Sequence, residues 1–550
     1  MKTKYVILLL ALILVVSLGF KLIVSDFSIP VYSDNLDYTL FAIAHTNGDF
    51  SQSSHRGMGW SLFTSIFFGF IDSDNLLDYS VIIKSLSIVI GLSTIPVIYL
   101  IGRKFFDQRY SLFAASLFAF EPHLNYNSTL GLTEPMFILA VVGSFYFILN
   151  QNTRLFLISS ILAGVAYWIK INGLWVFIVI SIIYFVIQKK SWKLVVTYGI
   201  GIGIFLLIIS PVLYERNNEF GDPFYSVYKD TIFAGSYESM LNAMEDKKKI
   251  SVFDYIENNG IFSFVNVYLL TGLYNTLYVT WSLCFPYLFI LIPFGILFSF
   301  RAFDQNRNFI KSNWLFIIIS IAFLILTMAI VPDRRFVMYL LPFLMIFSVI
   351  PVQRVIEYGL STFSFSRKQK DIFLIGVIMT VIILSTIVIV RYVPDSQLES
   401  EKLEFSKYAL KNFDGVTLRD YTGSLDYVQY LLISNSFENY KINSGILEIS
   451  ETKFKETDAP NGKTIEELII SGKNYNLKYF ISNEIPGIIH PVTDEIFNDH
   501  SKYPYLKKIF DSEKYGFQKL KIKVFEIDYE YFESIIDVSF KEIIIKEKQL

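Results

Sequence analysis

The sequence contains about eleven mostly apolar stretches, each close to the roughly 20 residues that a helix needs to cross a bilayer. Lipid offers no partners for backbone polar groups, so each stretch is expected to satisfy its own groups as an α-helix. The amphipathic region 255–278 could form either a further span or an interfacial helix. The pattern therefore predicts an α-helical polytopic membrane protein. The stretches lie near 5–24, 78–101, 110–126, 133–150, 155–170, 172–188, 193–214, 279–300, 313–331, 336–353 and 372–392.

Composition agrees with this class: 53% of the residues are hydrophobic and 18% are charged, whereas soluble domains are about a quarter charged. The net charge of −2 gives no reason to expect a nucleic-acid partner. Cys284 is the one cysteine, which excludes an intrachain disulfide and a cysteine-based metal site. The N-terminal apolar run lacks a small-residue cleavage site, so we expect an uncleaved first helix.

Loop charges orient the spans. With the N-terminus in the cytoplasm, all loops on that side carry Lys or Arg, as the positive-inside rule requires. These loops read "RKFFDQR", "QNTR", "QKKSWK", "RAFDQNRNFIK" and "QRVIEYGLSTFSFSRKQK". The loops 25–77, 127–132, 171, 215–278 and 332–335 then face outside, as does everything after 392. We expect an integral, multi-pass protein of a prokaryotic cell membrane.

The chain changes character near residue 393. Residues 1–392 are expected to form the transmembrane domain, and 393–550 a soluble extracytoplasmic domain of the α/β or α+β class. "EELIISGKNYNLKYFISN" is typical of a helix followed by a strand, and "YLKKIFDSEKYGFQKLKIKVFEIDY" of a helix, a turn and a strand. The size suits a single small domain.

Ionisable residues gather on the predicted outer face, and charges at a membrane edge indicate function by default. Asp34 and Asp37 share one face if their segment is helical. Such carboxylates can act as a general base or hold a metal, or they can simply cap a solvated loop. The full set is Asp34, Asp37, Asp49, His55, Arg56, Glu121, His123, Glu134, Lys170, Asp333, Arg334 and Arg335.

Each of the other charges also has a structural alternative. Arg56 could anchor the chain at the headgroup layer, and Lys170 could reach the interface along its own apolar stem. Glu134 could complement the dipole of a helix that Thr133 caps and Pro135 opens. Arginines are disfavoured on the outer side, so Arg334 and Arg335 suggest an anionic ligand or a lipid phosphate.

Four pieces of sequence occur in order: "SDNLDYTLFAIAHTNGDF", "HRGMGWSLFTSIFFGF", "TEPMFIL" and "DRRFVMYLLPFLMI". Together they resemble the motifs of GT-C fold glycosyltransferases, in particular the dolichyl-phosphate-mannose protein mannosyltransferases and aminoarabinose transferases. Asp34 with Tyr38 is similar to the acidic first-loop motif, and Arg335-Phe336 to the family's Arg-Tyr position. The resemblance covers about residues 1–395. Asn35 stands where relatives carry Glu, and Lys170 where they often carry Arg.

The resemblance implies an inverting transfer of a hexose or pentose from a polyprenyl-phosphate donor to a hydroxyl on protein, lipid or glycan. It implies catalytic roles for Asp34, Asp37 and Glu134, with Asp34 as the base. Arg334, Arg335, Lys170 and Arg56 would bind the donor phosphate. No cofactor is certain, although a divalent metal could be held by His55, His123 and Glu121.

Two other function classes stay open. A transporter or lipid flippase would place charges in the middle of spans and show an internal repeat, whereas Lys84 is the main mid-span charge here. A non-catalytic assembly protein could share the same fold. The chain has no P-loop, no HExxH and no G-x-S-x-G, so it does not read as an ATPase, a zincin or a serine hydrolase.

Overall fold

The computed structural model describes residues 3–50, 56–150, 152–188, 191–300, 307–420, 422–437, 454–457, 462, 464–484 and 491–535. Contacts divide the chain into two units. The membrane unit comprises Met1–Tyr237 and Lys249–Pro394, and the polar unit comprises Glu238–Lys248 and Asp395–Leu550.

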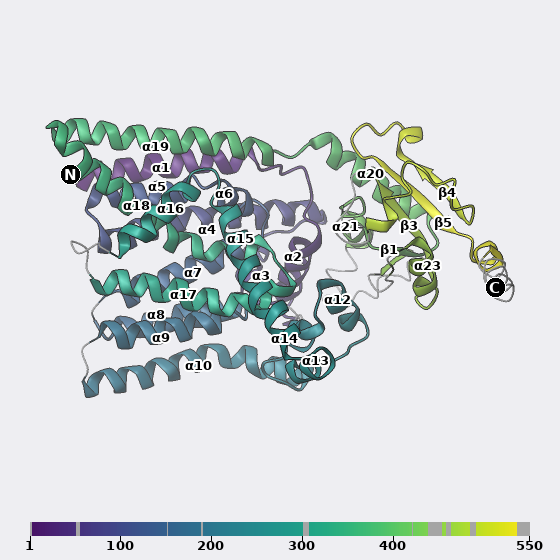
Figure 1. Cartoon of the computed structure of the whole chain (residues 1–550), viewed down its shortest axis with the longest axis horizontal. Coiled ribbons are helices and arrows are strands. Elements are labelled where there is room, and N and C mark those ends of the chain that lie inside the picture. The colour runs from purple at the N-terminus through teal and green to yellow at the C-terminus, as the bar shows by residue number, and fades with distance from the viewer. Residues whose placement is uncertain are drawn as a thin grey trace, which may run out of the picture. The chain divides into compact units, whose positions relative to one another are not determined.

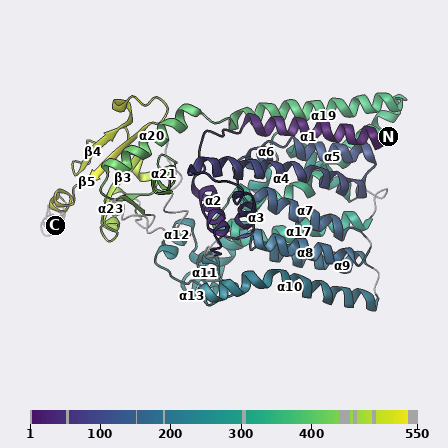
Figure 2. The ribbon, with the colours of Figure 1, turned by 180° about the vertical axis from the view of Figure 1, so that it is seen from behind.

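The membrane unit is a bundle of roughly parallel helices (Figures 1 and 2). Short helices lie across one end of the bundle, which we call the site end; we call the opposite end the far end. The short helices are α2 (Ser33–Thr46), α3 (Gly59–Phe68), α11 (Val227–Thr231), η1 (Ile232–Ala234), α13 (Val252–Asn259) and α14 (Ile261–Phe264). The long ones are α1 (Thr3–Ile23), α4 (Leu76–Phe105), α5 (Gln108–Ala119), α7 (Glu134–Ile148), α8 (Leu155–Ile169), α9 (Gly173–Ile187), α10 (Trp192–Phe220), α15 (Gly272–Leu283), α16 (Leu288–Ser299), α17 (Arg307–Ile330), α18 (Leu341–Arg354) and α19 (Arg367–Ile389).

Every one of the predicted apolar stretches is helical, which confirms an integral, multi-pass membrane protein. Among the described residues, six helices are long and apolar enough to cross a membrane, or up to seven if one bent pair counts as a span. The helices α7, α8 and α9 are apolar but shorter. The number of spans, about eleven, therefore stays a prediction.

Two predicted spans are broken at prolines, because proline cannot donate the intrahelical hydrogen bond. The stretch 110–126 ends as α5 at Ala119 and resumes as α6 (Pro122–Asn127), with Glu121 as its N-cap. The stretch 279–300 divides between α15 and α16 around Pro286. The amphipathic region continues from α14 through a π-helical segment, Val265–Thr271, into α15. The pair Ile261–Leu283 and Leu288–Ser299 is bent by 117°.

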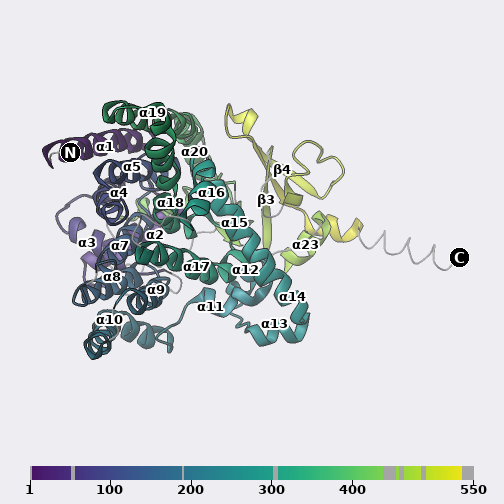
Figure 3. The ribbon, with the colours of Figure 1, turned by 60° about the vertical axis from the view of Figure 1, so that its left-hand side comes forward.

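Small residues bring the helices of this bundle close together. A Cβ on Gly295 of α16 would lie 2.3 Å from the carbonyl oxygen of Phe347, and one on Gly272 of α15 would lie 2.2 Å from that of Ile325. Such contacts give van der Waals packing where lipid removes the usual hydrophobic drive between helices. Figure 3 shows the same bundle from a second direction. Any larger side chain at these glycines would push α16 from α18, or α15 from α17.

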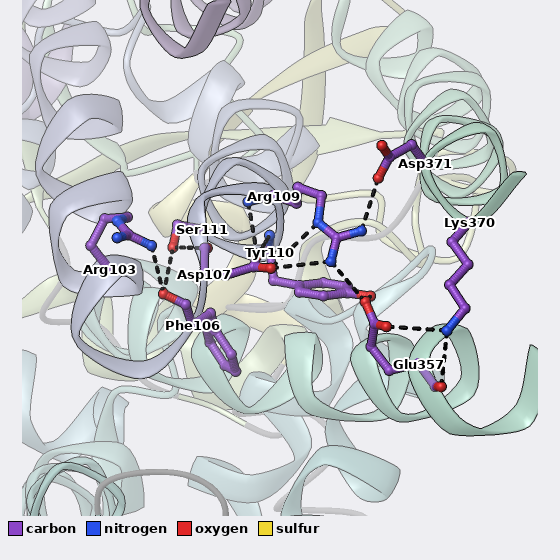
Figure 4. Close-up of polar contacts among 9 residues, drawn as sticks. All are labelled: Arg103, Phe106, Asp107, Arg109, Tyr110, Ser111, Glu357, Lys370 and Asp371. Atoms are coloured by element: carbon purple, nitrogen blue, oxygen red, sulfur yellow. Dashed lines mark hydrogen bonds and ion pairs between the residues drawn. The ribbon is translucent and has the colours of Figure 1, made fainter. Parts of the chain in front are cut away.

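An ionic network closes the far end (Figure 4). The guanidinium of Arg109, at the start of α5, lies 2.9 Å from both Glu357 and Asp371 and 3.2 Å from Asp107. The two predicted cytoplasmic loops around residues 103–109 and 353–370 therefore meet. Glu357 belongs to η5 (Val355–Gly359), a π-helical extension of α18 that η6 (Leu360–Phe363) follows, and Asp371 belongs to α19.

Glu357 has two further partners in this network. The hydroxyl of Tyr110 donates to its carboxylate at 2.8 Å, and Lys370 lies 3.3 Å from it. The network thus joins α5 to η5 and α19, which lie more than 200 residues later in the sequence. Charges at a membrane edge are stable when each has partners of opposite sign.

The polar unit contains a five-stranded mixed sheet in the order β2-β1-β3-β5-β4. Strands β1 (Gly415–Leu418), β2 (Phe454–Thr457) and β3 (Leu477–Asn483) are parallel, while β4 (Leu506–Asp511) and β5 (Ile522–Ile527) pair antiparallel with each other and with β3. The unit also contains α20 (Ser396–Asn412), α21 (Val428–Asn435), α23 (Ile465–Lys473), η8 (Pro491–Thr493), η9 (Ser512–Tyr515) and most of α12 (Tyr237–Glu245). The helix and strand predicted in 466–483 are present as α23 and β3.

The helix predicted for "YLKKIF" is wrong, because this segment forms strand β4. Its pairing with β5 supplies hydrogen bonds that a weak helical propensity cannot match. Glu401 of α20 fixes this side of the sheet by accepting backbone N–H bonds from three consecutive residues, 518–520. Burial alone would raise the pKa of Glu401, but these hydrogen bonds stabilise its charged form more strongly and lower that pKa.

We expect Arg109→Ala to lower the stability of the membrane unit by about 1–3 kcal/mol, since it leaves Glu357 and Asp371 without their shared cation. Thermal unfolding of the purified protein in detergent measures this change. The exposed Lys368→Ala variant, on the same loop, serves as the control. Equal melting temperatures for the two variants would contradict a stabilising network.

The carboxyl of Asp426 makes the polar unit sensitive to pH. Burial raises its pKa to about 6, with a smaller opposing effect of Lys402 and further raising by Glu399 and Asp420. Because the folded pKa exceeds the unfolded value of about 3.9, this group destabilises the fold as pH rises from about 4 through 6. Asp426→Asn should therefore raise the melting temperature at pH 7.5 more than at pH 5. The exposed Glu530→Gln variant should show no such difference.

Candidate functional site

An acidic pair on α2 forms the centre of the site. Asp34 lies in the first turn of α2 and Asp37 follows one turn later, on the same face as predicted for a helical segment. One nitrogen of Arg56, Nη2, lies 2.9 Å from Asp34 and 2.6 Å from Asp37. Arg56 therefore ties the two aspartates together from the far side of the first loop.

The turn before α18 supplies a second arginine. Asp333 caps the short helix η3 (Arg334–Phe336) by accepting the backbone N–H of Arg335, and its carboxylate also lies 2.8 Å from that guanidinium. Arg335 reaches Asp34 at 2.6 Å, although the two residues are 301 positions apart in the chain. The carboxylate of Asp34 thus has one guanidinium on each of its two oxygens.

These charges fix the protonation of Asp34. Burial alone would raise the pKa of Asp34, but Arg56 and Arg335 outweigh it and hold that pKa well below its usual value. Burial would likewise lower the pKa of both arginines, and the neighbouring acids raise it instead. Asp34 is therefore a carboxylate throughout the physiological range, and its side chain is 31% exposed.

A second ion pair lies beside the first group. Glu134 opens α7, with Pro135 in the first turn, and Lys170 follows the last residue of α8. Lys170 lies 2.5 Å from Oε1 of Glu134. Glu134 is only 4% exposed, and no described residue donates a hydrogen bond to its Oε2. The buried carboxylate therefore keeps one oxygen able to accept a further donor.

Tyr38 joins the two groups. Its ring lies under the guanidinium of Arg56, 5.3 Å from the ring centroid, and Thr133 lies beside its hydroxyl. Thr133 occupies the N-cap position of α7, but its side chain makes no capping hydrogen bond. Burial raises the pKa of Tyr38 to about 12; Arg56 opposes this shift, and Glu134 adds to it. Tyr38 is therefore a neutral hydrogen-bonding group between the acids.

The structure separates the remaining predicted residues from this cluster. Arg334 lies near the hydroxyl of Tyr392 of η7 (Val390–Tyr392). Glu121 and His123 form a buried pair of their own, 2.8 Å apart, and the His123 ring packs on the edge of Tyr392 at 5.7 Å. His55 lies outside the described residues. Asp49 holds His45 through its backbone oxygen.

No metal site emerges in the part of the chain that the structure describes, since no group of three or more His, Cys, Asp or Glu could hold an ion there. Glu121 and His123 supply two ligands at most. Asp34 and Asp37 direct their oxygens at arginines, which repel cations.

Tyr228 of α11 was missed from the sequence. It is close enough to Asp34, Arg56, Asp333 and Arg335 to feel their charges, and burial raises its pKa. Lys84 of α4 donates to the carbonyl oxygens of Asp26 and Ile29, at 2.9 and 2.6 Å, and so anchors the start of the first loop. A tyrosine in a short polar helix carries no sequence signal of this kind.

Comparisons with known proteins bear on the fold of the chain. The model of the dolichyl-phosphate-mannose-protein mannosyltransferase family matches residues 74–214. The apo oligosaccharyltransferase of Archaeoglobus fulgidus is similar over 88% of this chain and 70% of its own, at 13% identity and a TM-score of 0.56. The A. fulgidus oligosaccharyltransferase AglB, solved with an inhibitory peptide and a dolichol-phosphate, is similar over 86% of this chain and 69% of its own. Its identity is 13% and its TM-score 0.54.

ArnT of Cupriavidus metallidurans, bound to undecaprenyl phosphate, aligns over 96% of this chain and 98% of its own, at 10% identity and a TM-score of 0.46. The sequence matches none of the curated proteins. The likeness to the oligosaccharyltransferase shows that the chain has the GT-C fold, as predicted.

The Glu134–Lys170 pair gives a test by stability. Lys170→Met should destabilise the membrane unit by about 3–5 kcal/mol, because it leaves a buried carboxylate without its cation. The double variant Glu134→Gln, Lys170→Met removes both charges and should recover most of that loss. Thermal unfolding in detergent measures both. A double variant as unstable as Lys170→Met alone would show that the pairing does not account for the loss.

Proposed function

We propose that this protein is a glycosyltransferase that moves a sugar from a polyprenyl-phosphate donor to a hydroxyl acceptor on protein, lipid or glycan. The observation that carries the proposal is the carboxylate of Asp34, ionised and held between two arginines at one end of a GT-C bundle. The family match over residues 74–214 supports the same class. AglB has been solved with a dolichol-phosphate, which supports a lipid-linked donor here.

The reaction is a single displacement that inverts the anomeric carbon. The acceptor oxygen forms a bond to that carbon while the bond from the carbon to the phosphate oxygen breaks. Asp34 takes the hydroxyl proton, and the polyprenyl phosphate leaves with the electron pair. Arg335 neutralises the charge that develops on the phosphate, since a guanidinium can donate two parallel hydrogen bonds to it.

A donor phosphate would also change the base. In the structure Arg335 lies 2.6 Å from Asp34, and this contact helps to keep its pKa low and its basicity weak. A phosphate that draws Arg335 away would leave Asp34 with Arg56 alone and raise its pKa. The side chains of both residues are about one-third exposed, so a ligand can reach them. Donor binding would thereby prepare the base for proton transfer.

The remaining acids then have supporting roles. Arg56 keeps Asp37 and Asp34 on one face, rather than contacting the phosphate itself. Lys170 occupies Oε1 of Glu134, and Oε2 of Glu134 accepts a hydroxyl of the bound sugar. We place the site on the extracytoplasmic side, because two of the basic loops meet at the far end.

The transporter alternative has less support. It depended on Lys84 as a charge inside a span, and Lys84 is used to hold the first loop through two backbone carbonyls. A transported substrate would need this group to be available near the middle of the membrane.

Asp34→Asn should reduce sugar transfer by about 10²–10⁴-fold, because the amide cannot accept the hydroxyl proton. Purified protein in nanodiscs is supplied with a panel of undecaprenyl-phosphate sugars, and transfer is measured with matched acceptors. Binding of undecaprenyl phosphate should survive the substitution.

Asp371→Asn is the matched control, since this aspartate also pairs with an arginine but lies at the far end. It should retain transfer close to that of the parent. Full transfer by Asp34→Asn would exclude Asp34 as the base, whereas no transfer by the parent with any donor would argue against the enzyme class.

A further inference from the structure

Residues 56–60 of the first loop contact both the aspartate pair on α2 and the end of α8 beside Lys170. The Arg56 side chain holds the aspartates, as described above. A Cβ on Gly57 would lie 2.4 Å from the carbonyl oxygen of Ile169, and one on Gly59 would lie 2.7 Å from the carbonyl carbon of Trp168. Only glycines at positions 57 and 59 therefore allow this segment to pack against the end of α8, next to Lys170.

The other end of the segment is fixed as well. Trp60 is fully buried, and its indole N–H donates to the carbonyl oxygen of Gly131 at 2.8 Å. Gly131 lies three residues before Glu134. The five residues 56–60 thus connect the aspartate pair on α2 to the Glu134–Lys170 pair between α7 and α8.

A buried arginine of α10 holds this segment from the opposite side. Nη2 of Arg216 donates to the carbonyl oxygen of Arg56 at 3.0 Å, and Nη1 donates to the carbonyl oxygen of Tyr225. Arg216 is 3% exposed, and its guanidinium lies 5.9 Å from the centroid of the Phe220 ring. Burying a guanidinium is costly, so its hydrogen bonds to the carbonyls of Arg56 and Tyr225 must offset that cost.

We propose that Arg216 is a positioning residue of the site, which sets the direction of the Arg56 guanidinium by holding the Arg56 carbonyl. This inference rests on the proposed function. With the carbonyl fixed by Arg216 and the next residues packed on α8, the side chain of Arg56 points at Asp34 and Asp37. Arg216 contacts neither aspartate itself and acts through Arg56. Small displacements of such a group reduce catalysis strongly.

The test replaces Arg216 by methionine, which keeps the apolar stem and removes the guanidinium. Arg216→Met should reduce transfer by about 10- to 100-fold, with the larger effect on kcat, because the aspartates lose their fixed geometry. Arg103→Met is the matched control: Arg103 also donates to a backbone carbonyl, that of Phe106, but at the far end. It should leave transfer unchanged.

A double-variant cycle separates positioning from general support of the fold. If Arg216 acts through Arg56, then Arg56→Gln with Arg216→Met should be no more than about twofold worse than Arg56→Gln alone. Losses that multiply in the double variant would overturn the proposal, since Arg216 would then act by another route.

Backbone hydrogen exchange tests the same contact without using activity. Peptides that cover residues 56–60 should exchange faster in Arg216→Met than in the parent, while peptides of α4 keep the same rate. Unchanged exchange in 56–60 would overturn the proposal even if transfer falls. If the parent shows no transfer with any donor, the proposed function fails, and the exchange result still decides whether Arg216 holds the loop.

Discussion

The bridge that Asp34 makes between Arg56 and Arg335 is the interaction on which the candidate site depends. It brings the first loop against the turn before α18, which lies 301 residues later. Two guanidiniums on one carboxylate offset the cost of removing these charges from water, and neither arginine alone could do so as well. Loss of either arginine would leave the partly buried Asp34 beside a single cation. The same three residues also set how basic Asp34 is.

The two ends of the bundle use charge in different ways. At the far end, Arg109 shares its guanidinium among three acids and ties α5 to η5 and α19, so the network closes on itself. At the site end, two members of the ion pairs can still bind another group. Oε2 of Glu134 has no hydrogen-bond donor among the described residues, and the side chain of Arg335 is one-third exposed. A closed network stabilises a fold. An incomplete one can exchange a partner for a ligand.

The sequence predicted much of this architecture. Apolar length located the helices of the membrane unit, and loop charge grouped Asp34, Glu134, Lys170 and Arg335 on one face. It also suggested the GT-C fold through short motifs. It did not predict the breaks at Pro122 and Pro286, because apolar runs continue across them. It assigned a helix to the segment that became β4, since strand pairing depends on residues far away in the chain.

Residue types and their order determined which side chains could meet at the site end, because the length of a span and the positive-inside rule act locally along the chain. Which of them meet was decided only by tertiary packing. Arg334 and Arg335 are adjacent in sequence, yet one reaches Tyr392 and the other Asp34. Arg216 and Tyr228 carry no motif and still lie at the site, since the last turns of α10 and the chain after it lie there. Side-chain direction follows from the packing of distant helices, and the linear sequence does not state it.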